Sequence, residues 1–289
     1  RISNASAEGI ATGEPIFGID AQVDGMVYAS FVKCPSIGGV AKSANLEVVK
    51  ALPGIIDAFI LDGTPGPYNF DIRESYAIQS GVAIVGKDTW PTFKARETLK
   101  VDWDLSTASR DDSDAIEAEA LTALAAGKVE TEIERAGDVD AAFANAAMTA
   151  DATYSTDFVS HAQLEPQGVV ISAATSAVEV WTSSQTPVFV TSNLVKLLDV
   201  TPGNITVHQL RGGGGFGRRL SNEYIYEAAL ISRRVGAPVK LQWKREDDMA
   251  FDYFRAPTYY RLQGAISTDG QLTGWKNLVA SASADGKTA

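Results

Sequence analysis

The feature of this sequence that most plainly suggests a binding site is a run of glycines. Residues 208–243 read HQLRGGGGFGRRLSNEYIYEAALISRRVGAPVKLQW, with four consecutive glycines, a Phe-Gly pair and two arginines at an expected helix start. Backbone N–H groups at a helix start, with no side chains in front of them, form a natural cradle for an anion. The stretch therefore predicts a nucleotide site, a metal-cofactor site or only a tight turn.

The glycines satisfy a dinucleotide-binding pattern in form. Gly212, Gly214 and Gly217 give G-x-G-x-x-G between an expected strand and an expected helix, which is the context this pattern requires. Against it, too little sequence follows to complete a doubly wound sheet, and four glycines in a row exceed what that fold needs. The acidic residue of the next strand is displaced to Glu246, nearly thirty positions past Gly217. A P-loop is excluded because no Lys-Ser or Lys-Thr follows.

Other reactive side chains are few and scattered. Cys34 is the only cysteine, and His161 and His208 are the only histidines, so no zinc or iron–sulfur site held by side chains is expected. We interpret the thiol as half-buried and inert, and the histidines as buried hydrogen-bonding residues, with His161 at a strand edge or turn. The segment REDDM at 245–249 clusters three carboxylates. We expect it to be a solvated loop anchored by Arg245.

Composition excludes several classes of protein. The chain has 289 residues, 45% of them hydrophobic, a net charge of −11 and a pI near 4.7. Nucleic acid and anionic membrane are disfavoured as partners because both require basic patches. No apolar run reaches the roughly 18–20 residues of a membrane span. The first residues, RISNASAEG, contain neither an initiator Met nor a signal-like segment, and we expect a fragment, a processed chain or a trimmed one.

Residues 10–104 predict a first α+β unit. The segment 43–54 carries Leu46, Val49 and Leu52 at helical spacing and stops at Pro53-Gly54, as an amphipathic helix does. A second helix is expected at 88–99, with its proline in the first turn. Segments rich in β-branched and aromatic residues predict strands, at 25–35, 55–61, 80–86 and 100–104.

Residues 105–148 are acidic and rich in alanine. They predict a solvated helical connector, with a docking surface for another subunit as the alternative. In residues 149–289, strands are expected at 204–210 and 238–243 and a helix at 187–200. A further helix should begin after Ser221 as N-cap and end at Val235 before Gly236, with Tyr224, Ala228, Ile231 and Val235 as its buried stripe.

The order and spacing of these segments resemble a known family. From residue 11 to about Trp275, the chain resembles the large, molybdopterin-binding subunit of the xanthine dehydrogenase/aldehyde oxidase family, closest to the isoquinoline 1-oxidoreductase β-subunit type. Five segments carry the resemblance: GVAIVGKDTWPTFKARETLKVDWD, HAQLEP, SSQTP, GGGFGRR and REDDM. The resemblance implies an α+β fold with an α/β-hammerhead domain at 10–104. The connector at 105–148 and the first part of a molybdenum-cofactor-binding domain at 149–289 would follow.

The resemblance also implies site residues. The loop Gly213-Gly214-Gly215-Phe216-Gly217 corresponds to the family loop beside the molybdenum, whose N–H groups face the oxygen ligands and the pterin dithiolene. Gln185, 31 positions before Phe216, corresponds to a glutamine that hydrogen-bonds an oxo ligand. Phe216 would line the substrate pocket, and no side chain would ligate the metal. Arg218 and Arg219 correspond to an arginine pair suited to the anionic cofactor or to a partner subunit. His161 and Glu165 match a motif with a structural role.

The implied activity is hydroxylation of an N-heteroaromatic or aldehyde substrate with oxygen derived from water. The implied cofactor is molybdopterin with molybdenum, in its cytosine dinucleotide form. Electrons would pass to a small subunit with [2Fe–2S] clusters, and a cytochrome-type acceptor is a further expected partner. Leu220, just past the loop, offers no charged contact and favours an apolar ring or aldehyde over a purine.

This sequence departs from the family pattern in one important respect. The family's catalytic glutamate, in a Gly-Val-Gly-Glu-type motif near the end of the full subunit, is absent from this chain. We therefore expect an incomplete enzyme that works with the remainder of its large subunit. The alternatives are a non-catalytic scaffold, and a nicotinamide or flavin oxidoreductase that uses the glycine pattern. The resemblance favours a bacterial periplasm over the cytoplasm.

Overall fold

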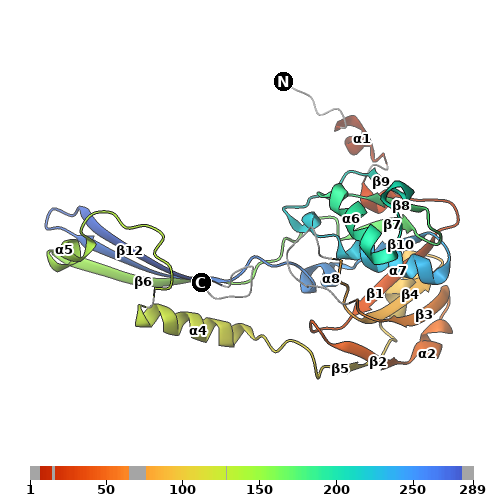
Figure 1. Ribbon diagram of the computed structural model, residues 1–289, viewed down its shortest axis with the longest axis horizontal. Helices are drawn as coiled ribbons and strands as arrows, with labels where there is room; N and C mark the ends of the chain where they lie inside the picture. Colours follow the sequence, from red (N-terminus) through yellow and green to blue (C-terminus); the bar gives the residue numbers. More distant parts are fainter. Residues whose placement is uncertain (1–6, 15–16, 65–75, 128, 282–289) are drawn as a thin grey trace. The chain divides into compact units, whose positions relative to one another are not determined.

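The chain folds into two units, and each unit combines two separate stretches of sequence. The computed structural model describes residues 7–14, 17–64, 76–127 and 129–281. Of these, the described residues up to Ser109 and from His161 to Tyr253 form the first unit, and those from Arg110 to Ser160 and from Phe254 to Ser281 form the second (Figure 1). The glycine-rich stretch, His161 and Gln185 therefore all belong to the first unit.

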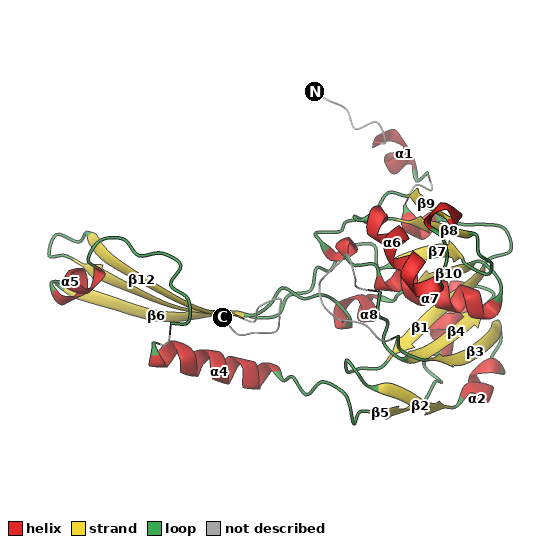
Figure 2. Cartoon of the chain, viewed as in Figure 1, coloured by secondary structure: helices red, strands yellow, loops and turns green. Residues whose placement is uncertain are grey.

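A seven-stranded mixed sheet forms the centre of the first unit (Figure 2). Its β1 pairs in parallel with β10, in register Val27↔Val239, and this contact joins the two sequence stretches in one sheet. The predicted boundaries at 104 and 149 therefore separate strands that are hydrogen-bonded in the fold. In spatial order the strands are β3 (Ile55–Leu61), β4 (Gly81–Gly86), β1 (Val27–Lys33), β10 (Val239–Gln242), β7 (Gly168–Ser172), β8 (Val178–Thr182) and β9 (Ile205–Gln209).

Helices cover both faces of this sheet, which explains why β4 is buried along its whole length. On one face, α6 (Pro187–Leu198) and α7 (Glu223–Val235) pack over a core that includes Phe31 and Val85. On the other, α2 (Leu46–Lys50) and α3 (Thr89–Ala95) pack over Val82 and Ile84. Successive residues of a strand point to opposite faces, so an unbroken apolar run is what a doubly covered strand requires.

Shorter elements complete the first unit. The strands β2 (Val40–Ala44) and β5 (Val101–Asp104) form a two-stranded sheet. The others are helices and 3-10 turns: α1 (Ala7–Thr12), η1 (Gly18–Asp20), η2 (Pro202–Asn204), η3 (Arg218–Leu220) and α8 (Arg245–Ala250). No helix among the described residues is long and apolar enough to cross a membrane.

Three details of the sequence prediction were wrong. The helix expected from residue 43 begins at Leu46, because Ser43 and Ala44 pair with β5. The N-cap of α7 is Asn222 and not Ser221. The REDDM segment is the helix α8, with Asp247 and Asp248 buried, because both carboxylates find partners inside the unit.

The helix α7 is more deeply buried than a four-residue stripe predicts. Every residue from Glu223 to Ala229 is buried, whereas Val235 is only partly so. Inside this helix, Glu227 forms an ion pair with Lys33 of β1 at 3.1 Å. Trp243 donates its indole N–H to the same carboxylate at 3.0 Å, and the Lys33 ammonium lies 3.3 Å from the Trp243 ring centroid. Burial raises the pKa of Glu227 to about 7 and lowers the pKa of Lys33.

Replacing Lys33 with Met should destabilise the protein by about 3–5 kcal/mol, because a buried carboxylate then loses its counter-charge. Without the ammonium, the pKa of Glu227 rises further, so the folded state holds a proton that the unfolded state has released. The free energy of unfolding of Lys33→Met should therefore fall more steeply than that of the wild type between pH 6 and pH 8. Urea titrations at pH 6 and pH 8 measure the free energy of unfolding of both proteins. An equal fall in this free energy between the two pH values would contradict the ion pair.

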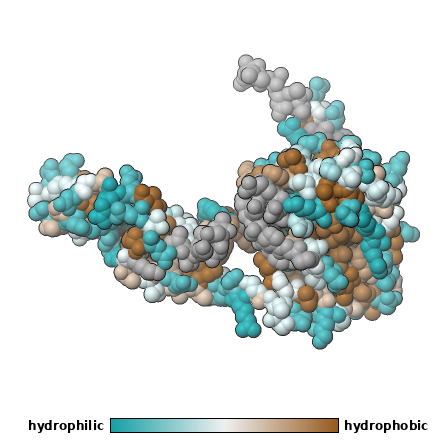
Figure 3. Space-filling model, in the orientation of Figure 1, coloured by the Kyte–Doolittle hydropathy of each residue, from teal (hydrophilic) through white to brown (hydrophobic). Residues whose placement is uncertain are grey.

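The second unit is a three-stranded antiparallel sheet with two helices. The strand order is β12 (Leu272–Ser281), β11 (Thr258–Ile266) and β6 (Met148–Thr156). The helices α4 (Ser113–Ala126) and α5 (Val139–Ala144) pack against β11 and β12. Two parts of the acidic stretch, α4 and α5, are helical, and both cover a sheet. Figure 3 shows hydrophilic residues over much of the visible face, with hydrophobic residues in smaller areas between them.

Candidate functional site

The glycine-rich loop leaves β9 and turns sharply before the 3-10 turn η3. Gly214 and Gly217 have φ values of 95° and 103°, in the region that favours glycine. Phe216 adopts φ 55° with a side chain that is 77% exposed, an uncommon combination for a bulky residue. The long helix α7 begins only at Glu223. The glycines therefore do not open a helix directly, as a dinucleotide-binding loop does.

Four successive backbone N–H groups of this loop are left without an acceptor. Among the residues that the structure describes, no hydrogen bond is made by the N–H groups of Gly214, Gly215, Phe216 and Gly217. The neighbouring N–H groups are satisfied: that of Gly213 donates to Glu165. The N–H groups of Arg218, Arg219 and Leu220 also donate within the chain. Such a cluster of free donors is suited to an anionic or oxygen-rich ligand.

Glu165 holds the start of the loop in place. Its carboxylate accepts hydrogen bonds from the backbone N–H of Gly213 and, at 2.8 Å, from that of Ile19. Its own N–H donates to the Gly213 carbonyl at 3.1 Å. The residue is 8% exposed, and a Cβ at Gly213 would lie 2.7 Å from the Glu165 Cβ. The close approach explains why glycine is required at this position.

Arg219 holds the other side of the same loop. Its Nε donates to the Gly214 carbonyl, its Nη1 to Gln167 Oε1 and its Nη2 to the Glu165 carbonyl, each at 2.8 Å. The side chain is 1% exposed. The sequence suggested a contact with the cofactor or a partner subunit for this guanidinium, whereas its hydrogen bonds are directed to its own chain. Arg219 therefore fixes the position of the loop through these hydrogen bonds.

Arg218 is equally buried and points to a different set of partners. Its Nε lies 2.9 Å from Asp252 Oδ1, and its Nη2 pairs with Glu223. Its guanidinium carbon lies 5.3 Å from the Tyr253 ring centroid, within cation–π range. Arg218 thus ties the end of the loop to the start of α7 and to the segment after α8.

Gln185 lies directly against the loop. Its Oε1 accepts from the Arg219 N–H at 3.2 Å, and its own N–H donates to the Arg219 carbonyl at 2.9 Å. A Cβ on Gly215 would lie 2.7 Å from Gln185 Oε1. The residue is exposed. The fold therefore brings together Gln185, Gly215 and Phe216, although 31 positions separate Gln185 from Phe216 in the sequence.

Several buried polar residues around the loop were not found from the sequence. Asp252 binds His161, Asp248 accepts from Gln163 Nε2 at 2.6 Å, and Arg96 makes a two-pronged contact with Asp247 at 2.5 Å. The only signal was that Asp247 and Asp248 belong to REDDM and that His161 and Gln163 belong to HAQLEP. Burial raises the pKa of Asp248, although the nearby arginines oppose this.

Two isolated residues differ from their prediction. His208 is not buried: its side chain is 41% exposed, stacks on Trp181 at 4.8 Å and approaches Glu179 at 3.2 Å. Cys34 is fully buried, not half-buried. Within the described part of the chain, no group of three His, Cys, Asp or Glu side chains could hold a metal ion.

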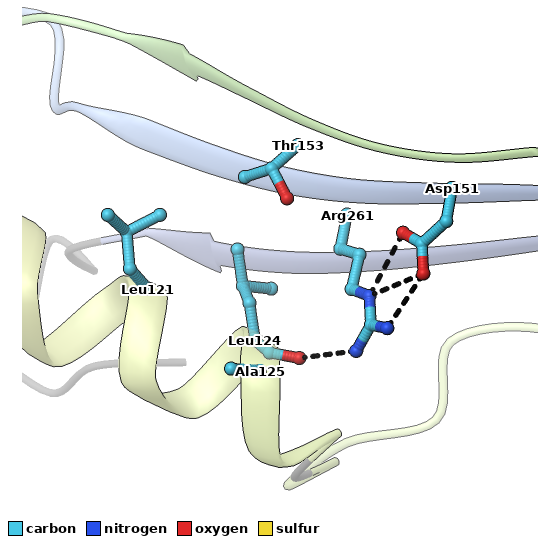
Figure 4. Close-up of a pocket in the computed structure, with 6 residues that line it drawn as sticks. All are labelled: Leu121, Leu124, Ala125, Asp151, Thr153 and Arg261. Carbon is cyan, nitrogen blue, oxygen red and sulfur yellow. Dashed lines mark hydrogen bonds and ion pairs between the residues drawn. The ribbon is translucent and has the colours of Figure 1, made fainter.

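A separate cavity of about 310 Å³ lies in the second unit, between α4 and the sheet (Figure 4). Leu121, Leu124 and Ala125 form its apolar side. On the other side, Arg261 makes an ion pair with Asp151 at 2.7 Å and donates to the Leu124 carbonyl at 3.3 Å. The cavity contains no site residue predicted from the sequence. The ion pair of Arg261 and Asp151 forms part of the cavity wall. Together with the hydrogen bond to the Leu124 carbonyl, it stabilises the contact between the helix and the sheet.

Replacing Glu165 with Gln should lower the free energy of unfolding by about 1–3 kcal/mol, because Ile19 and Gly213 donate to different carboxylate oxygens and in Gln one of these becomes an NH2 group that cannot accept, so one buried donor is left unpaired. Glu246→Gln is the matched control, since Glu246 is exposed. Denaturant unfolding of both variants measures the difference. Equal stability of the two would show that Glu165 does not hold the loop.

Comparison with known proteins identifies the class to which this fold and loop belong. A family model described as the molybdopterin cofactor-binding domain matches residues 122–284. Since the match covers more than half of the chain, the chain belongs to this family. The resemblance to the xanthine dehydrogenase/aldehyde oxidase family and the α+β fold class are thereby confirmed.

Two curated relatives match over most of the chain. The membrane-bound aldehyde dehydrogenase [pyrroloquinoline-quinone] of Gluconacetobacter polyoxogenes is 31% identical over 90% of this chain and 33% of its own length. Isoquinoline 1-oxidoreductase subunit beta of Brevundimonas diminuta is 28% identical over 93% of this chain and 33% of its own length. The chain thus spans about a third of these relatives.

A solved structure supports the fold. Quinoline 2-oxidoreductase from Pseudomonas putida 86 matches with a TM-score of 0.69 and 17% identity, over 96% of this chain and 38% of that one.

Proposed function

We propose that this chain forms part of a molybdenum hydroxylase and that its glycine-rich loop holds the molybdopterin cofactor. The observation that carries the proposal is the row of four free N–H groups from Gly214 to Gly217. Donors fixed in advance stabilise an anion without reorganising. The family match supports the choice of ligand.

The residues present fit such a cofactor in two respects. The loop has no side chain from Gly212 to Gly215, so a flat group can lie against the backbone. Its one side chain, Phe216, is exposed. The cofactor's own sulfurs would bind the metal, so this ligand requires no metal-binding side chain.

In this proposal each residue has a distinct task. Gln185 uses Oε1 for the Arg219 N–H and keeps its amide Nε2 to donate to an oxygen of the cofactor. Phe216 lines the substrate pocket. Arg218 and Arg219 hold the loop in position through their buried contacts with the rest of the chain. When bound, the molybdenum group supplies hydroxylation with oxygen derived from water.

The finer assignments follow the resemblance. The substrate is proposed to be an N-heteroaromatic compound or an aldehyde, and the cofactor to be the cytosine dinucleotide form. The partners are the remainder of the large subunit, which supplies the base glutamate, and a small [2Fe–2S] subunit. A cytochrome-type acceptor would take up the electrons, in the periplasm. The hammerhead domain at 10–104, the connector at 105–148 and the cofactor-binding part at 149–289 would be the family domains.

The proposal predicts that Gly214→Ala loses most of its molybdenum. A side chain at φ 95° is strained, and a Cβ there would lie 3.2 Å from the Phe216 ring, so the row of N–H groups would be displaced. Gly203→Ala is the control, because a Cβ at Gly203 has no atom within 4 Å. Both are made in the full-length protein with its partner subunit, and metal and pterin are measured per protein.

We expect near-stoichiometric molybdenum in the wild type and in Gly203→Ala, and at least about a tenfold lower molybdenum content in Gly214→Ala, which requires a loss of more than about 1.4 kcal/mol of binding energy. Wild-type complex without molybdenum or pterin would refute the proposed function. Full retention by Gly214→Ala would refute the role of the loop.

A further inference from the structure

His161 is held beside the free N–H groups of the glycine loop by a buried carboxylate. Its Nδ1 lies 2.9 Å from Asp252 Oδ1, and its backbone N–H donates to Asp252 Oδ2 at 2.6 Å. The Asp252 side chain is 1% exposed and forms an ion pair with Arg218, whose Nε lies 2.9 Å from Oδ1. The two Asp252 oxygens thus face the backbone N–H and the ring Nδ1 of His161 as acceptors. The proton of the ring contact therefore lies on Nδ1, and Asp252 fixes the orientation of the imidazole.

The other ring nitrogen of His161 faces the loop. Its Nε2 lies 3.5 Å from the position of a Cβ on Gly217, and no hydrogen bond to it exists among the described residues. The imidazole is 20% exposed, so a ligand on the loop can reach it. A histidine fixed at one nitrogen by a carboxylate presents the other nitrogen in a defined direction.

Each of the two facing segments contains a residue with a strained backbone. Ala162, directly after His161, has φ 47°, and Phe216 in the opposite loop has φ 55°. The Cβ of Gln163 lies 3.4 Å from where a Cβ on Gly214 would be. Two non-glycine residues in this conformation at one place cost free energy, and such strain gathers at functional sites.

We propose that His161 is a positioning residue of the cofactor site and that its Nε2 accepts a hydrogen bond from an N–H group on the edge of the pterin ring. The inference rests on the proposed function, because the ligand is the cofactor held by Gly214–Gly217. The loop N–H groups bind the electron-rich part of the ligand, and His161 recognises a donor group. The site thereby distinguishes a pterin from a simple anion.

Two substitutions separate this role from a purely structural one. In His161→Asn the amide nitrogen can replace Nδ1 toward Asp252, but no atom remains at the place of Nε2. In His161→Gln the longer amide reaches the place of Nε2 and the contact with Asp252 is lost. Both variants are made in the full-length protein with its partner subunit. Two quantities are measured: the half-time of release of the molybdenum-loaded pterin after dilution, and the thermal midpoint of the cofactor-free protein.

We expect His161→Asn to release the pterin about tenfold faster, the effect of losing one hydrogen bond, with a thermal midpoint near that of the wild type. His161→Gln should release it within about threefold of the wild-type rate and melt at a lower temperature. The reverse order, unchanged release in both variants, or equal acceleration in both would overturn the inference. Absence of molybdenum from the wild type would instead refute the proposed function.

Discussion

The candidate site depends on one buried carboxylate that receives backbone N–H groups from two distant parts of the chain. Glu165 binds Ile19 near the start of the chain and Gly213 at the head of the glycine loop. Arg219 closes the arrangement by binding the carbonyls of Glu165 and Gly214. A buried ion that satisfies several donors fixes their relative positions, because each unmade hydrogen bond would be costly. The loop is consequently held at Gly213 and Gly214, and the N–H groups from Gly214 to Gly217 remain available.

Further buried ion pairs connect Glu165, Arg219 and the loop to the rest of the first unit. Arg218 joins the loop to Glu223 on α7 and to Asp252, and Glu227 joins α7 to Lys33 on β1. Since β1 pairs with β10, these contacts run from the loop to the centre of the sheet. Removing one partner from one of these buried ion pairs leaves an isolated charge in the interior. The unusual burial of α7 is therefore a requirement of the site as much as of the core.

The sequence predicted the regular elements well where burial leaves a pattern. Ile55–Leu61 and Gly81–Gly86 are apolar runs, and both are strands of the doubly covered sheet. The family resemblance singled out both Gln185 and the loop, and the fold places them in contact; their roles at the cofactor stay a prediction. The sequence prediction failed where burial of charge decides the structure. The carboxylates of REDDM suggested a solvated loop, but Asp247 and Asp248 are buried. Their partners Arg96 and Gln163 lie 151 and 85 residues away in the sequence. Long-range pairs of this kind leave no local periodicity.

The central claim is that the four N–H groups of Gly214–Gly217 are the donors that hold the cofactor. Amide hydrogen exchange over residues 212–217 tests it directly, in full-length protein with and without bound molybdopterin. Exchange of these amides should slow at least about tenfold on loading, because each N–H gains an acceptor. If exchange over these residues were the same in both states while molybdenum was present, the cofactor would be held elsewhere and the claim would be wrong.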